Sequence, residues 1–292
     1  HDDAAKKTGA KIIPLCGHDC IPWDLSVLAL SNELKKHDKN DELMEVNCYD
    51  EIRADASGGT MKTVFTALGN RRKYKAAIGF DPLLKEGNGN KSTNKYIPAV
   101  QKTLGYSSEH NNGSWVGFFI MSMVMANCVR RSNVLLNYSS KLKYSEARVH
   151  PNFFAAFNET LGLIMLGAII VSPPIVWLFL TLGLLPSPGD GPSVKAMDKG
   201  FLKLTSYGYG TQGKNGKCYK SIFYFPTDPG YRDTARMLAE SGILLALDND
   251  KTCKNGGLHT PASALGMALV DRLVATGCTF EVEEVVKTCR LE

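Results

Sequence analysis

An unbroken apolar run from Leu161 to Leu185 constrains this chain more than any other feature. The run contains no charged side chain, and it is longer than the roughly 20 apolar residues that a helix needs to cross a bilayer core. Pro173 and Pro174 lie at its centre, where proline removes a backbone donor and turns the preceding residue away from helical geometry. The run therefore predicts either one kinked spanning helix or two short helices that form a hairpin.

Membrane attachment of this run is favoured over the alternative, a buried helical hairpin in a soluble enzyme. Tryptophan and phenylalanine beside leucine-rich sequence suit an interfacial or lipid-facing surface. The residues expected to contact lipid are Leu161, Ile164, Ile169, Ile170, Pro173, Pro174, Trp177 and Phe179.

The overall composition is that of a packed globular protein. The chain has 292 residues, of which 44% are hydrophobic and 22% charged, so disordered, collagen-like and coiled-coil folds are excluded. Its net charge of +5 is mild. It could favour an anionic membrane surface, but it lacks the concentrated basic character typical of nucleic-acid binding, and no nucleic-acid partner is expected.

Cysteine usage indicates reduced thiols rather than a disulfide framework, because the 8 cysteines are spread thinly over a long chain. Cys16, His18 and Cys20 could offer two thiolates and an imidazole to a metal. A tetrahedral zinc site needs a fourth ligand, and no second cysteine–histidine pair with suitable spacing follows. No metal is expected.

The first residues predict the end of a parallel α/β sheet. A helix over 2–8 should stop at Gly9, a strand should cover 11–15, and a helix should follow with Pro22 near its start. This order is that of a parallel α/β unit, so the chain is expected to begin in the middle of such a sheet. It starts at His1, which we interpret as a processed protein or a fragment.

The rest of the chain alternates between strand and helix patterns. Strands are predicted over 43–49, 138–148 and 280–286, and helices over 60–68, from Asp228 to Leu247, and from Pro261 to a stop at Gly277. Residues 118–129 could form either a helix or a buried strand. Segments 201–209 and 217–225 alternate in polarity around Asn215-Gly216, which predicts an antiparallel hairpin. The predicted domains are 1–41, 42–155, 156–190 (the hydrophobic segment) and 191–292.

One glycine motif is misleading. Residues 208–213 match the dinucleotide pattern G-x-G-x-x-G, which requires a preceding strand and a following helix whose N-terminus meets the pyrophosphate. Here a turn and another strand are predicted to follow, so the motif is interpreted as a glycine-rich hairpin.

Several motifs together resemble the saccharopine dehydrogenase-like oxidoreductase family. They run in family order over nearly the whole chain: 16–24 (CGHDCIPWD), 57–60 (SGGT), 129–133 (VRRSN), 188–193 (PGDGPS), 228–231 (DPGY) and 260–262 (TPA) with Gly266. His18 and Cys20 depart from the phenylalanine and serine usual at those positions. The family's opening strand and glycine turn are also missing.

The resemblance implies a fold in which the end of a Rossmann-type parallel sheet precedes a mixed α/β substrate or dimerisation domain. The residues singled out for cofactor or substrate binding are Cys16, Gly17, Asp19, Asp24, Ser57, Gly58, Gly59, Thr60, Arg130 and Arg131. Each has a structural alternative, such as helix capping, turn formation or a solvated basic pair. No residue is singled out as catalytic.

The function implied is that of a membrane-associated oxidoreductase that transfers a hydride between NAD or NADP and a carbonyl, imine or enoyl group, with a lipid-like substrate as one candidate. Because the glycine-rich nucleotide turn is absent, this chain is not expected to bind the cofactor alone. The alternative is a non-catalytic accessory subunit of a large membrane complex. Expected partners are membrane lipid, such a complex, or a second copy in a homodimer, at an organelle membrane or lipid droplet.

Overall fold

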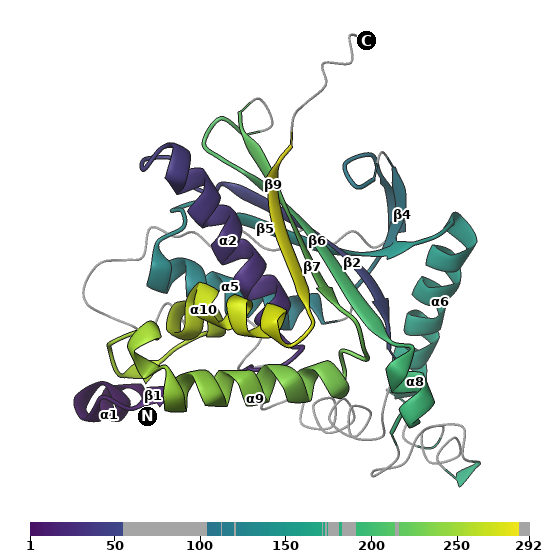
Figure 1. Ribbon diagram of the computed structural model, residues 1–292. Helices are drawn as coiled ribbons and strands as arrows, with labels where there is room; N and C mark the ends of the chain where they lie inside the picture. The colour runs from purple at the N-terminus through teal and green to yellow at the C-terminus, as the bar shows by residue number, and fades with distance from the viewer. Residues whose placement is uncertain are drawn as a thin grey trace.

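A mixed β-sheet organises the chain in the computed structural model (Figure 1). The structure describes residues 1–54, 104–111, 113–119, 121–170, 172, 174, 181–182, 191–213 and 216–285. In this part of the chain the main sheet has 7 strands in the order β3-β4-β5-β2-β6-β7-β9. The strands are β2 (Glu45–Arg53), β3 (Leu104–Ser107), β4 (Ser114–Gly117), β5 (Lys143–His150), β6 (Phe201–Tyr209), β7 (Cys218–Phe225) and β9 (Thr279–Glu284).

The sheet is mostly antiparallel. Among the strands of this sheet that the structure describes, only β2 and β5 pair in parallel, with Glu45 opposite Lys143, whereas β6 runs antiparallel to both β2 and β7. A separate ribbon pairs β1 (Lys11–Ile12) in parallel with β8 (Gly257–Leu258). The mixed α/β class is therefore confirmed. A continuing parallel sheet was expected at the start of the chain. The described residues show there a parallel pairing of two residues per strand, and the partner strand β8 comes from near the end of the sequence.

Helices cover one face of the main sheet and enclose the core. These are α2 (Ile21–His37), α5 (Ser122–Leu136), α9 (Arg232–Leu247) and α10 (Pro261–Ala275), and they lie together on one side in Figure 1. Fully buried side chains such as Trp23, Leu30, Phe223 and Leu269 fill the space between helices and strands. This burial of apolar surface is the main stabilising contribution to the fold.

The shorter helices are α1 (Asp2–Thr8), α8 (Val194–Asp198) and the 3-10 turn η2 (Asn249–Lys251). The first ends, as predicted, at Gly9, whose φ of 75° is a left-handed conformation that glycine adopts without strain. Thr260 caps α10 by accepting from the backbone N–H of Ser263, and the Ser263 side chain accepts from the Thr260 N–H in return. This capping box fixes the predicted helix start at Pro261.

Local signals predicted several elements well. The hairpin of β6 and β7 is confirmed, and segment 208–213 lies at its turn rather than before a helix. Within segment 118–129, the residues from Ser122 onward form a helix, α5. The predicted strand 138–148 instead begins at Lys143 as β5. The helix predicted over 60–68 lies outside the described residues.

The long apolar run is described only in part. Helix α6 (Phe153–Ile170) packs its first half against β4 and β5 at the opposite end of the sheet from α10. Within the run, Leu161 and Ile164 are exposed and Ile169 is half-buried. Pro173, Trp177 and Phe179 lie outside the described residues, so the hairpin or kink is untested. Among the helices that the structure describes, none combines the length and apolarity needed to cross a bilayer.

Candidate functional site

The segment 16–24, which the sequence singled out, is anchored to the helical layer. The Cys16 Sγ lies 3.3 Å from the Ile13 carbonyl oxygen. The backbone N–H of His18 donates to the Thr234 Oγ1 at 3.0 Å, and Gly17 packs so closely that an added Cβ would lie 3.1 Å from Thr234. Burial raises the pKa of Asp19. The loop is therefore held against the N-terminal part of α9.

Asp24 joins three helices from inside the core. Its Oδ1 accepts from the Ser132 hydroxyl of α5 at 2.5 Å, and its Oδ2 accepts from the Ala262 N–H in the first turn of α10 at 2.8 Å. Burial raises the pKa of this carboxyl to about 6. Both carboxylate oxygens are thus used within the protein, where a negative charge also suits the N-terminus of α10.

The two arginines of α5 have different partners within the chain. Arg131 donates from Nη2 to the Leu258 carbonyl oxygen of β8 at 2.7 Å, whereas Arg130 donates to the Asn127 side chain on its own helix at 3.1 Å. Segment 57–60 lies outside the described residues. The structure thus brings Asp24 and Arg131 to the same end of the helical layer, and a ligand-binding role for these residues remains a prediction.

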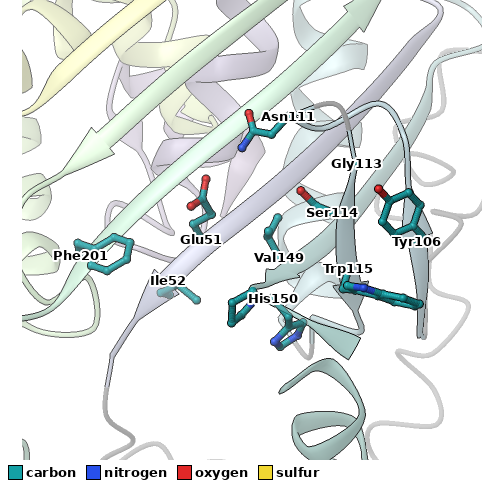
Figure 2. Close-up of a pocket in the computed structure, with 11 residues that line it drawn as sticks. Glu51, Ile52, Tyr106, Asn111, Gly113, Ser114, Trp115, Val149, His150 and Phe201 are labelled. Carbon is teal, nitrogen blue, oxygen red and sulfur yellow. The ribbon is translucent and has the colours of Figure 1, made fainter. Parts of the chain in front are cut away.

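A pocket that the sequence reasoning missed lies on the other side of the sheet. It has a volume of about 430 Å³ and lies between the ends of β2, β4, β5 and β6. Figure 2 shows Trp115 and Tyr106 at one side of the pocket, Phe201 and Ile52 at the opposite side, and Glu51 and Asn111 between them. The full lining is Glu51, Ile52, Tyr106, Asn111, Gly113, Ser114, Trp115, Val149, His150, Pro151 and Phe201. Apolar walls with a few convergent polar groups are typical of small-molecule sites.

Glu51, which lines the pocket, belongs to a network of charged and polar side chains. The Nε2 of the fully buried His110 lies 3.6 Å from the Glu51 Oε1, and the Lys203 ammonium donates to the same oxygen at 3.0 Å. These two partners, His110 first, hold the pKa of Glu51 down at about 2. The carboxylate that faces the pocket is therefore ionised throughout the physiological range.

Behind this network, Glu109 organises a second set of hydrogen bonds. Its two oxygens accept from the hydroxyls of Tyr49 at 2.7 Å and Tyr209 at 2.5 Å. Burial raises the pKa of both tyrosines, and the hydrogen bond to Glu109 adds to this effect. The Tyr49 ring stacks on His110 with 5.0 Å between centroids. Glu109 therefore fixes the aromatic support beneath the imidazole.

The apolar end of the pocket leads directly to α6. The Trp115 ring makes edge contacts with Tyr106 at 5.4 Å and with Phe153 at 5.0 Å. Across the strand, Glu159 of α6 pairs with Arg148 at 3.0 Å and lies 3.8 Å from the His150 Nδ1. Burial lowers the pKa of His150, which favours its neutral imidazole near pH 7.

One sequence signal could have located this pocket. Glu45, Asn47, Tyr49 and Glu51 occupy alternate positions of β2, so they share the sheet face away from the helices. The polar residues 108–111 follow β3, and His110 among them stacks on Tyr49 of that face. The strand had been predicted only to residue 49, and neither β3 nor β4 was predicted, so the two halves of the pocket could not be brought together.

Among the described residues, the glycine-rich segment 208–213 does not form a cradle for a dinucleotide. The one glycine-rich match, Gly208 to Gly213, joins two antiparallel strands. It therefore lacks the helix N-terminus that binds a pyrophosphate.

Comparison with known proteins establishes the family. A Mycobacterium tuberculosis protein provisionally named a trans-acting enoyl reductase is 31% identical over 293 residues, which cover 96% of this chain and 69% of that protein. The trans-acting enoyl reductase of Mycobacterium ulcerans is 31% identical, and that of Mycobacterium bovis strain BCG is 30% identical; each match covers 95% of this chain and 68% of the relative. The chain belongs to the trans-acting enoyl reductase family. It matches no protein-family model.

This finding corrects the family assignment made from short motifs. The assignment to the saccharopine dehydrogenase-like family was wrong, because the relatives that align with nearly the whole chain are named as enoyl reductases. Several of the motifs are helix starts, such as Thr260 before α10, and capping sequences recur in unrelated folds for structural reasons. The expectation of oxidoreductase character is supported by these relatives, and the accessory-subunit alternative is not favoured.

Proposed function

We propose that this protein reduces the carbon–carbon double bond of an enoyl group and that the pocket beside β2 and β4 holds the substrate. The observation that carries the proposal is the alignment of nearly the whole chain with enoyl reductases. A reduced nicotinamide cofactor, NADH or NADPH, would supply the hydride. We assign to the described residues only the binding of the substrate.

The pocket has the surface that such a substrate requires. The Trp115, Val149 and Phe201 side chains form apolar walls, and they suit the hydrocarbon part of an acyl group. Between these walls, the Asn111 amide and the Ser114 hydroxyl are polar groups near which the acyl carbonyl would lie. The ionised Glu51 would accept from a substrate hydroxyl or amide N–H rather than bind an anion.

The experiment uses the protein expressed from its complete gene. It is incubated with NADH or NADPH and with a 2-enoyl thioester, a ketone or a cyclic imine, and the products are identified by mass spectrometry. The proposal expects the saturated thioester as the main product. Trp115→Ala should raise the KM for the thioester about tenfold, the effect of losing one large apolar contact. Reduction of only the ketone or only the imine would overturn the proposal.

We also propose that the protein associates with an intracellular membrane through α6. Beyond Thr160 every residue of this helix is apolar, glycine or alanine, and none of those whose surroundings are described is fully buried. Ile164 is 65% exposed and Met165 is 56% exposed, and Phe154 near the helix start is 74% exposed. A helix that is apolar all round calls for an apolar environment on every side, whereas a protein partner would cover one stripe.

The length of this segment suits one leaflet. Residues 161–169 span about 14 Å of helix, which is close to half of a bilayer core of about 30 Å. The following residues to Leu185 carry no charge. Flotation with phosphatidylcholine vesicles, with and without anionic lipid, tests the proposal. The protein should float, Ile164→Glu with Met165→Glu should abolish flotation, and the matched control Leu135→Glu on α5 should not. A wild-type protein that stays at the bottom of the gradient would contradict it.

A further inference from the structure

Tyr106 lies opposite Trp115 in the antiparallel ladder of β3 and β4, and both side chains line the pocket. The two rings meet edge to face, with 5.4 Å between their centroids. Tyr106 is 60% exposed, so this packing holds one edge of the ring and leaves the rest accessible. A molecule in the pocket can therefore reach the tyrosine.

Gly113 determines where the Tyr106 hydroxyl lies. The glycine has a φ of 131°, a conformation that residues with a side chain rarely adopt, and a Cβ added there would occupy the position of the Tyr106 oxygen. Figure 2 shows this oxygen at the end of the ring that faces Ser114. The hydroxyl is thus directed from one wall of the pocket toward the polar groups between the walls.

Reduction of an enoyl group requires a proton as well as a hydride, and few polar groups of the pocket can supply it. Glu51 carries no proton at neutral pH, because its pKa is held at about 2. Ser114 is an alcohol, a weaker acid than a phenol, and it donates to a backbone carbonyl oxygen at 3.3 Å. His150 presents its Nδ1 to Glu159 of α6 at 3.8 Å, and the Asn111 amide is not an acid. Among the described side chains of the lining, this leaves the tyrosine hydroxyl.

We propose that Tyr106 donates the proton that completes the reduction, an inference that rests on the proposed function. Once the hydride from NADH or NADPH has formed a C–H bond at the β-carbon, the electron pair of the double bond lies in a thioester enolate and the cofactor is oxidised. This pair forms a C–H bond at the α-carbon with the Tyr106 proton, and the O–H bond breaks. The phenolate left on Tyr106 takes a proton from water. Tyrosine is among the side chains that perform such proton transfers in enzymes.

The position of Tyr106 suits the α-carbon of the substrate. The acyl carbonyl would lie beside Asn111 and Ser114, and the α-carbon is bonded directly to the carbonyl carbon. The Tyr106 hydroxyl faces this side of the pocket, whereas the hydrocarbon part of the substrate would lie along Trp115. Loss of the hydroxyl should therefore slow the chemical step and leave substrate binding unchanged.

Tyr106→Phe tests the proposal in the protein expressed from its complete gene. The substrate is a 2-methyl-2-enoyl thioester, because protonation makes its α-carbon a stereocentre that chiral chromatography can resolve. The wild-type protein should form one enantiomer. The variant should lose at least about 100-fold in kcat, the lower end of the effect of a general acid, and its remaining product should be a mixture of enantiomers protonated by water. Tyr231→Phe, at an exposed tyrosine before α9, should match the wild type.

Two further measurements separate proton donation from a structural role. Calorimetry with the saturated thioester, without cofactor, should give the same Kd for Tyr106→Phe and the wild-type protein within about twofold, as expected when an interaction of the chemical step alone is removed. The urea midpoint of the variant should stay close to that of the wild type, because the Tyr106 side chain is largely exposed.

The outcomes distinguish this inference from the function on which it rests. If Tyr106→Phe keeps its kcat and forms the same single enantiomer, the assignment of Tyr106 is overturned and the proposed function stands. A raised KM or Kd with an unchanged kcat would also overturn the assignment, because it would show that the tyrosine only binds the substrate. If the wild-type protein forms no saturated thioester, the proposed function fails and the role of Tyr106 fails with it.

Discussion

The Nε2 of His110 lies 3.6 Å from the Oε1 of Glu51. His110 is buried on the sheet face away from the helices, and Glu51 lines the pocket. This pair connects two parts of the site. His110 rests on Tyr49, which Glu109 holds from behind, and Glu51 faces the space where a substrate would lie. The first two predictions follow from this arrangement.

Glu51 should make the protein acid-sensitive. Its pKa is about 2 in the fold against an ordinary value of 4.5, so its contribution to stability is present above pH 4.5 and is lost as the pH falls toward 2. We expect Glu51→Gln to reduce the free energy of unfolding by about 2 kcal/mol at pH 7 and to have a much smaller effect at pH 3. Urea unfolding at the two pH values measures this. An equal loss at both would show that the charge of Glu51 is unimportant.

Glu109 should contribute strongly to the stability of the protein through the tyrosines that support the pocket. Glu109→Ala removes the acceptor of two tyrosine hydroxyls, and we expect the free energy of unfolding to fall by about 2–4 kcal/mol. Glu109→Gln retains one acceptor oxygen and should lose about half as much. Chemical denaturation followed by tyrosine fluorescence distinguishes the two variants. Equal stability of the alanine variant and the wild-type protein would refute this role.

Glu146 should destabilise the fold at alkaline pH. Both of its carboxyl oxygens are buried, and burial, with Asp50 nearby, raises its pKa well above the usual range. The folded state keeps a proton that the unfolded chain releases above about pH 4.5, so stability falls as the pH rises by up to about 1.4 kcal/mol per unit.

Glu146→Gln removes this linkage. The variant and the wild-type protein should unfold at similar urea concentrations at pH 5, and the variant should be the more stable at pH 8. The mutation leaves in place the pH dependence of Asp50, whose pKa burial raises to about 7. Parallel pH profiles for the two proteins would mean that Glu146 is ionised in the fold.

Substitution of Asp24 tests whether this residue of segment 16–24 has a structural or a catalytic role. Asp24→Ala leaves the Ala262 N–H and the Ser132 hydroxyl without their shared acceptor, and we expect a loss of about 3 kcal/mol in the free energy of unfolding. The KM of protein that remains folded should not change. A stable variant with a raised KM would instead place Asp24 at the substrate.

Elements with local signals were predictable from the sequence, and those that depend on distant partners were not. Asn215-Gly216 between alternating segments predicted the β6–β7 hairpin, and Thr260-Pro261 predicted the start of α10. Nothing near Lys11, however, indicates that β1 pairs with Gly257 and Leu258. The parallel unit expected there extends no further than this pairing, because the following helix, α2, packs on the antiparallel strands β6 and β7 instead.

The site follows the same rule. Segment 16–24 looks functional because a glycine, a proline and two acids stand together, yet such residues also build the helix starts seen at α2 and α10. The pocket combines Glu51 of β2, Trp115 of β4 and Phe201 of β6, which come from three separate regions of the chain. Only the pairing order of the sheet brings them together.

The most direct test of the account follows the hydrogen that the reaction transfers. The protein from its complete gene is given a 2-enoyl thioester and nicotinamide cofactor that carries deuterium at the reducing position, and the product is examined by NMR. The account predicts a saturated thioester with deuterium on the β-carbon, formed with a raised KM by Trp115→Ala. Deuterium on the carbonyl carbon, or an unreacted double bond with both NADH and NADPH, would contradict it.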